Sequence, residues 1–274
     1  MPFCEAKDGT KLFFNDWGAP LAPPVVLISG WPFDADMWEY QASVLAGNGL
    51  RVIAYDRRGF GRSDQPWLGY DYNTFASDLA VIIDKLGLQS PSLVGFSMGG
   101  GEVVRYVSRY GASHVRSAVL ISSVAPFMLK TKDNPRGVDA SVFDSMVAEL
   151  KKDRPAFLAA FAKTFFGDRV LASPVSDETL DWAKNVGLLA SPKATIECVA
   201  AFSQTDFRAE MSSLKVPVLV IHGDADAVVP IELTGRLAAT AISGAVLKEY
   251  AGAPHGLFVT EKDRLARDLV TFLR

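Results

Sequence analysis

A serine with a glycine two residues away on either side offers this chain a nucleophile: Ser97, between Gly95 and Gly99. The short apolar run before it, Ser92–Phe96, predicts a buried strand, and the residues after it carry apolar side chains at helical spacing. Ser97 is therefore expected on a strand-to-helix turn, where the glycines permit a tight, strained backbone that lifts the hydroxyl clear of the sheet. The alternative is a glycine-rich turn that only packs closely. A base and an acid in the right order would decide between the two.

A serine hydroxyl needs a base, and the chain has only three histidines. His114 is predicted just past the end of the helix that Ser97 starts, about a helix length from the hydroxyl. His222 ends a predicted strand and is interpreted as a packed turn residue. His255 stands in a loop after the last predicted strand, at the carboxyl edge of the sheet, and is the preferred base.

The acid that orients the base should fall between Ser97 and His255, because a serine on such a turn is followed in the chain by the acid and then the histidine. Asp224 and Asp226 both lie in the loop after the penultimate predicted strand. The residues alone leave this choice open: Asp226 is slightly preferred, and Asp224 would then cap the turn by bonding to backbone N–H groups. His255 would take the Ser97 proton as the hydroxyl attacks a carbonyl carbon, and the aspartate would stabilise the imidazolium.

The negative oxygen that develops in such a reaction needs two N–H donors, each worth about 3 kcal/mol. One is expected to be the backbone N–H of Met98, directly after the nucleophile. Trp31, in the loop after a predicted strand, is expected to supply the other. The next residue, Pro32, has no N–H to donate.

The elements that position these residues alternate between strands and helices. An antiparallel hairpin is predicted from Pro2–Ala6 and Lys11–Trp17, joined through an Asp-Gly turn. Mostly continuous apolar runs then predict strands covered on both faces: Pro24–Ser29, Val52–Asp56, Ser92–Phe96, Ser117–Ser123, Val216–Gly223 and Val246–Ala251. Helical patterns between several of them, such as Asp78–Leu88, complete an α/β fold with an eight-stranded, mostly parallel sheet flanked by helices.

The alternation breaks between about Pro126 and Glu210, where four helical patterns follow one another without a convincing strand. These patterns are Ser141–Lys152, Pro155–Phe166, Asp177–Ala190 and Lys193–Ser203. We expect a helical cap at residues 126–210, inserted after the sixth strand of a core made of residues 1–125 and 211–274. Ligands of open α/β sheets bind beyond the carboxyl ends of the strands, so this cap should lie over Ser97 and shape its pocket.

Composition limits the possible partners. The chain has 274 residues, of which 49% are hydrophobic and 22% charged, which predicts one large globular domain with a sizeable core. The formal net charge of -3 disfavours nucleic acid and anionic membranes as partners. The first residues do not resemble a signal peptide, so a cytoplasmic location is expected.

The two cysteines, Cys4 and Cys198, are far apart in the sequence and lack CxxC partners. We therefore expect buried free thiols and no metal or cofactor.

Several motifs together resemble the α/β-hydrolase fold family, and within it the bacterial arylesterases and cofactor-free haloperoxidases (non-haem chloroperoxidases and perhydrolases). The matching segments extend over nearly the whole chain: Asp34–Gln41, Tyr55–Trp67, Gly95–Val103, Thr205–Met211, His222–Pro230 and Gly252–Gly256. The resemblance implies Ser97, Asp226 and His255 as the catalytic triad, with Trp31 and Met98 as oxyanion donors. It thereby favours Asp226 over Asp224, and it implies that no cofactor is needed.

The loop that carries Trp31 departs from the family in one position and agrees with a subgroup in another. The family usually has histidine before the glycine of this loop, where this chain has Ser29. Members that make peracids well tend to have proline directly after the tryptophan, as here at Pro32. The resemblance therefore implies perhydrolysis as a second activity, while the alternative is that Pro32 only stiffens the loop.

The pocket is expected to be apolar. Phe161 and Phe165, four residues apart, lie on one face of a predicted cap helix and are either core packing or pocket wall. The resemblance adds Val124, Met128, Met146 and Val228 as lining residues. A confined apolar site of this kind favours short acyl or aryl esters over long lipids.

Two groups of charged residues are interpreted as structural. A loop ion-pair network is expected from Asp56, Arg57, Arg58, Arg62 and Asp64, which surround two glycines. Asp206 and Arg208 are expected to tie the end of the cap to the core.

The expected activity is hydrolysis of carboxylic esters through an acyl-enzyme on Ser97, with perhydrolysis as a side activity. The alternatives with the same residues are a perhydrolase or haloperoxidase, an acyltransferase, and an amidase or γ-lactamase as the main activity. A haloalkane dehalogenase is disfavoured because it needs a carboxylate where Ser97 stands. The alternative outside catalysis is a ligand receptor on the same fold. The partner is then a small-molecule ester or related acyl compound, and the resemblance also suggests a homo-oligomer.

Overall fold

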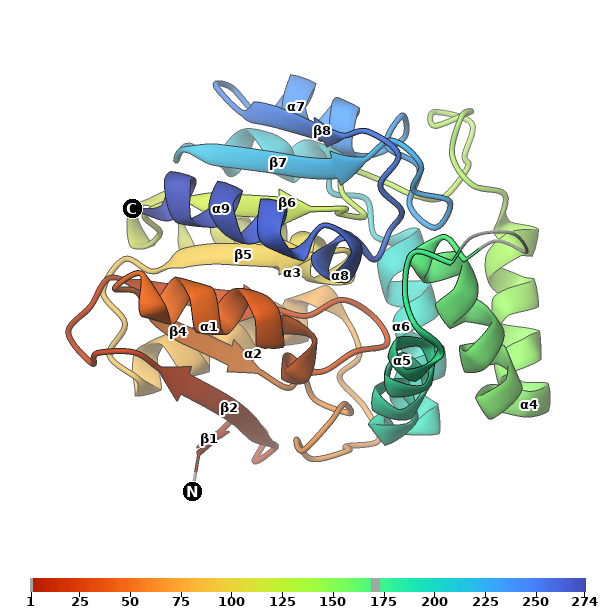
Figure 1. Ribbon diagram of the computed structural model, residues 1–274, viewed down its shortest axis with the longest axis horizontal. Helices are drawn as coiled ribbons and strands as arrows, with labels where there is room; N and C mark the ends of the chain where they lie inside the picture. Colours follow the sequence, from red (N-terminus) through yellow and green to blue (C-terminus); the bar gives the residue numbers. More distant parts are fainter. Residues whose placement is uncertain (1, 169–172) are drawn as a thin grey trace.

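One sheet of eight strands forms the centre of the protein. The computed structural model describes residues 2–168 and 173–274. The strand order is β1-β2-β4-β3-β5-β6-β7-β8 (Figure 1). The strands are β1 (Phe3–Glu5), β2 (Lys11–Trp17), β3 (Pro24–Ile28), β4 (Arg51–Tyr55), β5 (Ser92–Phe96), β6 (Ala118–Ile121), β7 (Val218–Gly223) and β8 (Val246–Tyr250). Strands β3 to β8 pair in parallel, whereas β2 pairs antiparallel with β1 and β4, which confirms the predicted hairpin and the mostly parallel sheet.

Helices cover both faces of the sheet. On the near face in Figure 1 lie α1 (Glu39–Gly47), α8 (Leu257–Thr260) and α9 (Lys262–Leu273), and behind it lie α2 (Tyr72–Lys85), α3 (Met98–Tyr110) and α7 (Gly235–Ala241). In β3, Val26 and Ile28 pack into one hydrophobic cluster, and Val25 and Leu27 into the other. Because successive side chains of a strand point to opposite faces, a sheet covered on both sides needs apolar residues at every position.

A helical insertion follows β6 and lies beyond the carboxyl ends of the parallel strands (Figure 1). Its helices are α4 (Ala140–Phe166), α5 (Asp177–Leu189) and α6 (Pro192–Gln204). Helix α4 spans two of the predicted helical patterns, and its backbone leaves helical geometry at Asp153 (φ −157°, ψ 86°), two residues before Pro155, whose ring disfavours a continuous helix. Residues 169–172, within the expected cap, lie outside the described residues. The boundary at residue 210 stays a prediction, because the 3-10 helix η3 (Arg208–Ser213) runs across it.

The two ends of the insertion meet. The N–H of Phe207 donates to the carbonyl of Pro126 over 2.8 Å. Arg208 pairs with its neighbour Asp206 at 2.6 Å and with Asp133 at 2.8 Å. The outgoing and returning segments of the insertion thus lie side by side. Whether Asp206 and Arg208 tie the cap to the core depends on where the cap ends, so that expectation stays a prediction.

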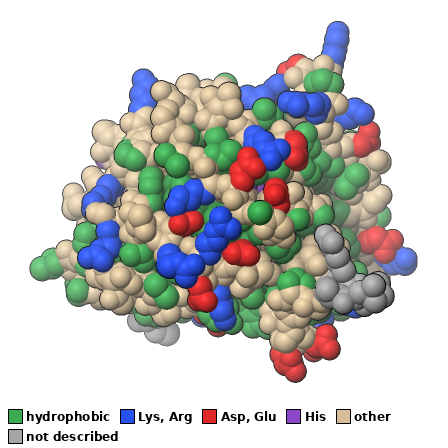
Figure 2. Space-filling view, turned by 45° about the horizontal axis from the view of Figure 1, so that its top comes forward, with side chains coloured by type: hydrophobic (Ala, Val, Ile, Leu, Met, Phe, Trp, Pro, Cys, Tyr) green, Lys and Arg blue, Asp and Glu red, His purple; other side chains and the backbone are tan. Residues whose placement is uncertain are grey.

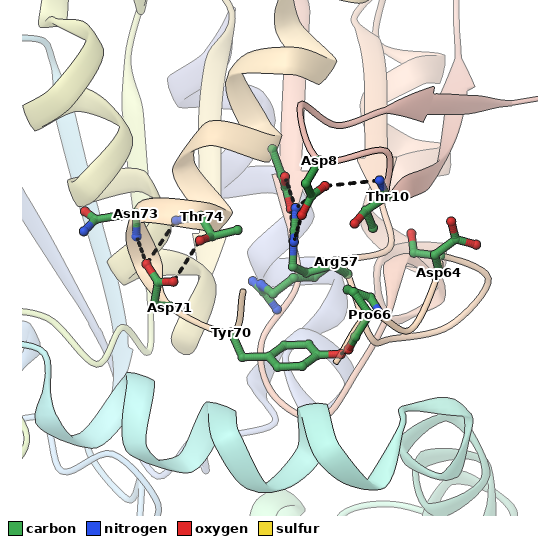
Figure 3. Close-up of polar contacts among 12 residues, drawn as sticks. Asp8, Thr10, Arg57, Asp64, Pro66, Tyr70, Asp71, Asn73 and Thr74 are labelled. Atoms are coloured by element: carbon green, nitrogen blue, oxygen red, sulfur yellow. Dashed lines mark hydrogen bonds and ion pairs between the residues drawn. The ribbon is translucent and has the colours of Figure 1, made fainter. Parts of the chain in front are cut away.

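Each of the three arginines around the two glycines forms an ion pair, but only the pair between Arg62 and Asp56 lies within the predicted loop network. Arg57 lies 2.9 Å from Glu102 in α3, Arg58 lies 2.6 Å from Asp78 in α2, and Arg62 lies 2.7 Å from Asp56. Asp64 accepts the backbone N–H of Lys11 over 2.8 Å. These contacts fasten the segment after β4 to several neighbours. Figure 3 shows part of this region, where Asp8 bonds to Thr10 in the hairpin turn and Asp71 caps α2 by facing the N–H groups of Asn73 and Thr74.

The surface is mixed in charge. On the face seen in Figure 2, basic and acidic side chains lie interleaved among hydrophobic and uncharged ones. Among the described helices, none combines the length and the apolar character needed to span a bilayer.

Candidate active site

Ser97 sits on a sharp turn between β5 and α3. Its backbone has φ 53° and ψ −117°, a left-handed conformation that is strained for a residue with a side chain. A Cβ at Gly95 would overlap the carbonyl of Gly99, and a Cβ at Gly99 would overlap the carbonyl of Ile28 in β3. The glycine spacing that predicted the turn is thus required by close backbone contacts on both sides of the serine.

Ser97, His255 and Asp226 form one chain of hydrogen bonds. The Ser97 Oγ lies 3.0 Å from His255 Nε2, and His255 Nδ1 lies 2.7 Å from Asp226 Oδ2. The three residues follow β5, β8 and β7 at their carboxyl ends, and all three are buried. The His255 ring is flanked by Phe96 and Phe165, with ring centroids 4.9 and 4.8 Å away. The packing fixes the imidazole in the orientation that the two hydrogen bonds require.

Two backbone N–H groups and two histidine rings surround the Asp226 carboxylate. Its Oδ1 accepts the backbone N–H groups of Val228 and Val229 at 2.9 and 2.8 Å, while its Oδ2 faces two histidines. Burial raises the pKa of Asp226, but His255 and His222 outweigh that effect, and the pKa lies well below its ordinary value. Asp226 is therefore an ionised acceptor at neutral pH.

Asp224 accepts a backbone N–H, as considered for it, but from a different loop and not from its own turn. Its Oδ1 accepts the backbone N–H of Gly252 over 2.6 Å, which connects the loop after β7 to the loop after β8. It thus bonds to the loop that carries His255, while Asp226 bonds to the imidazole itself.

The remaining histidines are placed differently from one another. His114 lies in the 3-10 helix η2 (Ala112–His114), after the end of α3 and thus far from Ser97, which precedes that helix. His222 is fully buried at the end of β7, in agreement with a packed residue, but its Nε2 also lies 3.3 Å from Asp226 Oδ2. This contact was not predicted from the sequence. The signal that could have found it is the spacing of four residues between His222 and Asp226 across the turn.

The loop with Trp31 lies against Ser97. Among the described residues, neither the N–H of Trp31 nor that of Met98, the first residue of α3, has a hydrogen-bond partner. The Trp31 indole donates to the carbonyl of Thr195 in α6 over 3.0 Å, so the cap fixes this side chain. Ser29 closes the loop by donating its hydroxyl to the carbonyl of Asp34 over 2.8 Å. A serine at this position, in place of the usual histidine, is thus compatible with an ordered loop.

Asp34, at the end of this loop, has one carboxyl oxygen without a hydrogen-bond partner among the described residues. Its Oδ1 accepts the N–H of Asp36, whereas its buried Oδ2 has no partner among the described residues. Burial and the nearby charge of Asp56 raise its pKa to about 7. The folded protein therefore binds this proton more tightly than the unfolded chain does.

We expect Asp34→Asn to stabilise the protein at pH 8. Since the pKa of Asp34 is raised from 3.8 to about 7 on folding, the free energy of unfolding falls as pH rises through that range and stays reduced above it. An asparagine cannot ionise, so the variant should gain about 1–3 kcal/mol over wild type at pH 8 and less at pH 5. Urea unfolding at both pH values measures this. An equal difference at the two pH values would contradict it.

A cavity of about 340 Å³ opens above Ser97 and His255, between the sheet and the cap. Of the predicted lining residues, it contains Val124, Met128, Met146, Phe161 and Val228, and Trp31 also lines it. The structure places Pro32 and Phe165 behind this lining. Phe165 is fully buried and packs edge-on against Phe33 and His255. Pro32 is buried toward Gly187 of α5. Of the two phenylalanines on one helix face, Phe161 is thus pocket wall and Phe165 is core packing.

Most of the remaining wall was not identified from the sequence. It is made by side chains of the insertion and of the loop after β7: Val138, Val142, Phe143, Ser145, Glu149, Phe157, Thr164, Phe202, Ala227 and Val229. Phe157 and Phe161, four residues apart in α4, stack with centroids 5.8 Å apart. Their spacing could have indicated a shared face. Which face looks into the cavity depends on how α4 packs against α6, which is a tertiary contact.

Cys4 and Cys198 are both buried and free, as expected. Burial raises the pKa of Cys198 to about 12, so its thiol is protonated at neutral pH. In the described ranges, no group of three histidine, cysteine or acidic side chains could hold a metal ion.

Known proteins share this architecture. Residues 23–262 match the alpha/beta hydrolase fold family. The chain is 41% identical to a bifunctional esterase/perhydrolase from Acinetobacter calcoaceticus, covering 100% of both chains, and 41% identical to a non-heme chloroperoxidase from Kitasatospora aureofaciens, covering 100% of this chain and 99% of that one. The crystal structure of a bromoperoxidase from Bacillus anthracis superposes with a TM-score of 0.94 at 42% identity, covering 99% of this chain and 98% of the other. The chain belongs to the alpha/beta hydrolase fold family, in its branch of haloperoxidases and esterases.

Proposed function

We propose that the protein is a serine carboxylic ester hydrolase that works through an acyl-enzyme on Ser97. The observation that carries this proposal is the continuous chain from the Ser97 Oγ through His255 to the ionised Asp226, at the floor of an apolar cavity. The similarity to an esterase/perhydrolase over the whole chain supports the same reaction.

We infer a role for each group. His255 Nε2 takes the Ser97 proton as the oxygen attacks the ester carbonyl carbon, and Asp226 stabilises the imidazolium through Nδ1. The N–H groups of Trp31 and Met98 would bind the negative oxygen of the tetrahedral intermediate. The intermediate collapses when the bond to the alcohol breaks and His255 returns the proton to the leaving oxygen. Water, deprotonated by the same imidazole, then cleaves the acyl-enzyme and regenerates Ser97.

The cavity favours small, uncharged substrates. Its volume of about 340 Å³ is modest, and its wall is mainly apolar and aromatic. The described lining residues include no Lys or Arg that could pair with a carboxylate on the acyl chain, and the apolar wall would leave such a charge uncompensated. We therefore propose short acyl or aryl esters without a negative charge.

Perhydrolysis is the second candidate activity. The relative from Acinetobacter is an esterase/perhydrolase, and this chain has Pro32 directly after Trp31 in the loop next to Ser97. In this reaction hydrogen peroxide attacks the acyl carbon in place of water, the bond to the Ser97 oxygen breaks, and a peracid leaves. The peracid could then oxidise halide in solution, so the protein itself would need no redox group.

Hydrolysis of p-nitrophenyl acetate, followed with and without hydrogen peroxide, tests both activities. We expect turnover of the acetate, a peracid fraction that increases with peroxide, and clearly slower hydrolysis of the matched p-nitrophenyl hemisuccinate. A fluorophosphonate probe should add its mass to the peptide that contains Ser97. If the probe does not label Ser97 and neither ester turns over, the protein is a ligand receptor on a hydrolase fold.

A cytoplasmic enzyme that forms homo-oligomers is also proposed. No described helix could span a bilayer, and the face seen in Figure 2 carries interleaved charges of both signs. Both findings are compatible with a cytoplasmic location. Light scattering of the purified protein would measure its mass in solution, and a monomer would refute the oligomer.

A further inference from the structure

A second imidazole contacts the carboxylate of the triad. His222 Nε2 lies 2.8 Å from the carbonyl oxygen of Val229 and 3.3 Å from Asp226 Oδ2. The same Oδ2 lies 2.7 Å from His255 Nδ1. His222 and Asp226 have fully buried side chains, so water does not screen this contact.

The partners of His222 determine where its proton lies. A carbonyl oxygen and an ionised carboxylate can only accept hydrogen bonds, so Nε2 must carry a hydrogen, which it donates to the Val229 carbonyl while lying 3.3 Å from Asp226 Oδ2. Nδ1 is buried and has no partner among the described residues, and protonating it would leave a buried N–H unpaired. A Cβ on Gly235 would lie only 2.6 Å from Nδ1, so the backbone of α7 fills the space on that side. His222 is therefore a neutral ring with one donor, fixed in place by packing.

We propose that His222 is a positioning residue for the triad: its Nε2–H donates to the Val229 carbonyl and, at 3.3 Å from Asp226 Oδ2, attracts that oxygen and keeps the carboxylate turned toward His255. This role rests on the proposed function of Ser97. The backbone N–H groups of Val228 and Val229 fix Oδ1, and His222 fixes the other oxygen. The same ring also joins the strand end at residue 222 to the loop that carries Asp226. Without this donor the carboxylate can rotate away from His255.

A matched pair of substitutions separates the donor from the packing. His222→Gln keeps an N–H donor near the position of Nε2, whereas His222→Met has a similar length and no donor. We expect His222→Met to lower kcat for p-nitrophenyl acetate by about 10- to 100-fold with KM changed less than about two-fold, because the bond acts on the reacting groups and not on substrate binding. His222→Gln should retain kcat to within about five-fold of wild type.

A measurement without turnover keeps this proposal separate from the proposed function. The proton on His255 Nδ1 gives a downfield resonance when it bonds to Asp226, and 15N-edited NMR of the intact protein detects it. We expect this signal to be present in wild type and His222→Gln and displaced upfield or broadened in His222→Met. An unchanged resonance and kcat in His222→Met, or equal loss in the Gln and Met variants, would overturn the role of the donor. If Ser97→Ala proved fully active, the proposed function would fail, while the resonance would still report on the His222 contact.

Discussion

Ser97→Ala is expected to lower kcat/KM for p-nitrophenyl acetate by about 10⁴- to 10⁶-fold. The methyl group of alanine leaves the position 3.0 Å from His255 Nε2 without an atom that can form the acyl bond. The remaining rate would come from water activated by His255 and from the oxyanion donors.

The folding of this variant should change little. Alanine keeps the Cβ, and with it the strain of the backbone at φ 53°, so it adds no new conflict at the turn. Thermal unfolding of both proteins provides the control. If the variant unfolds like wild type but retains more than about a hundredth of its activity, a different group is the nucleophile, since losing the attacking atom costs far more than that.

Asp226→Asn should have the second largest effect, a loss of about 10³- to 10⁴-fold in kcat. The carboxylate only accepts hydrogen bonds, and it faces His255 Nδ1 at 2.7 Å, so it keeps the proton on Nδ1 and leaves Nε2 free to accept one from Ser97. An asparagine that turns its NH₂ toward Nδ1 would favour the other tautomer. Nε2 would then carry a hydrogen and could no longer act as the base.

Asp224→Asn is the matched control for this substitution. Asp224 lies two residues away in the same loop, and its carboxylate accepts the N–H of Gly252, a bond that the amide oxygen of asparagine can also accept. We expect its kcat to remain within about three-fold of wild type, because it leaves the hydrogen bonds of the triad in place. Equal losses in both variants would show that the loop, and not the charge facing His255, controls the rate.

The core of the fold could be predicted because its signals are local. Buried parallel strands produce continuous apolar runs, and β5 was predicted to the residue at Ser92–Phe96. Other strand ends differ by one or two residues: the predicted strand Ser117–Ser123 exceeds β6 (Ala118–Ile121) by the serines that flank its apolar run. The elbow could be predicted because its backbone has no space for a Cβ at Gly95 or Gly99.

The site was predictable only where the chain offered few candidates. Three histidines made the preferred base almost a matter of elimination, whereas Asp224 and Asp226 could not be separated by spacing. The hydrogen bond of His222 to the Val229 carbonyl depends on how the chain turns after β7. Phe161 and Phe165 share a helix face, yet only the packing of α4 determines that one meets the cavity and the other meets His255.

The insertion begins and ends at one junction, where Phe207 bonds to Pro126 and Arg208 pairs with Asp133. This junction has a consequence for how proteins of this fold acquire different caps. Because the two ends of the insertion lie close together, it closes on itself next to the sheet. A different insertion could therefore be exchanged at the same two points while β6 and β7 remain paired. Two contacts link the present insertion to the reacting groups: the bond from the Trp31 indole to the carbonyl of Thr195, and the packing of Phe165 against the His255 ring. A transplanted cap would bring its own pocket wall, and would need to supply an acceptor for that indole and a side chain that packs against the imidazole.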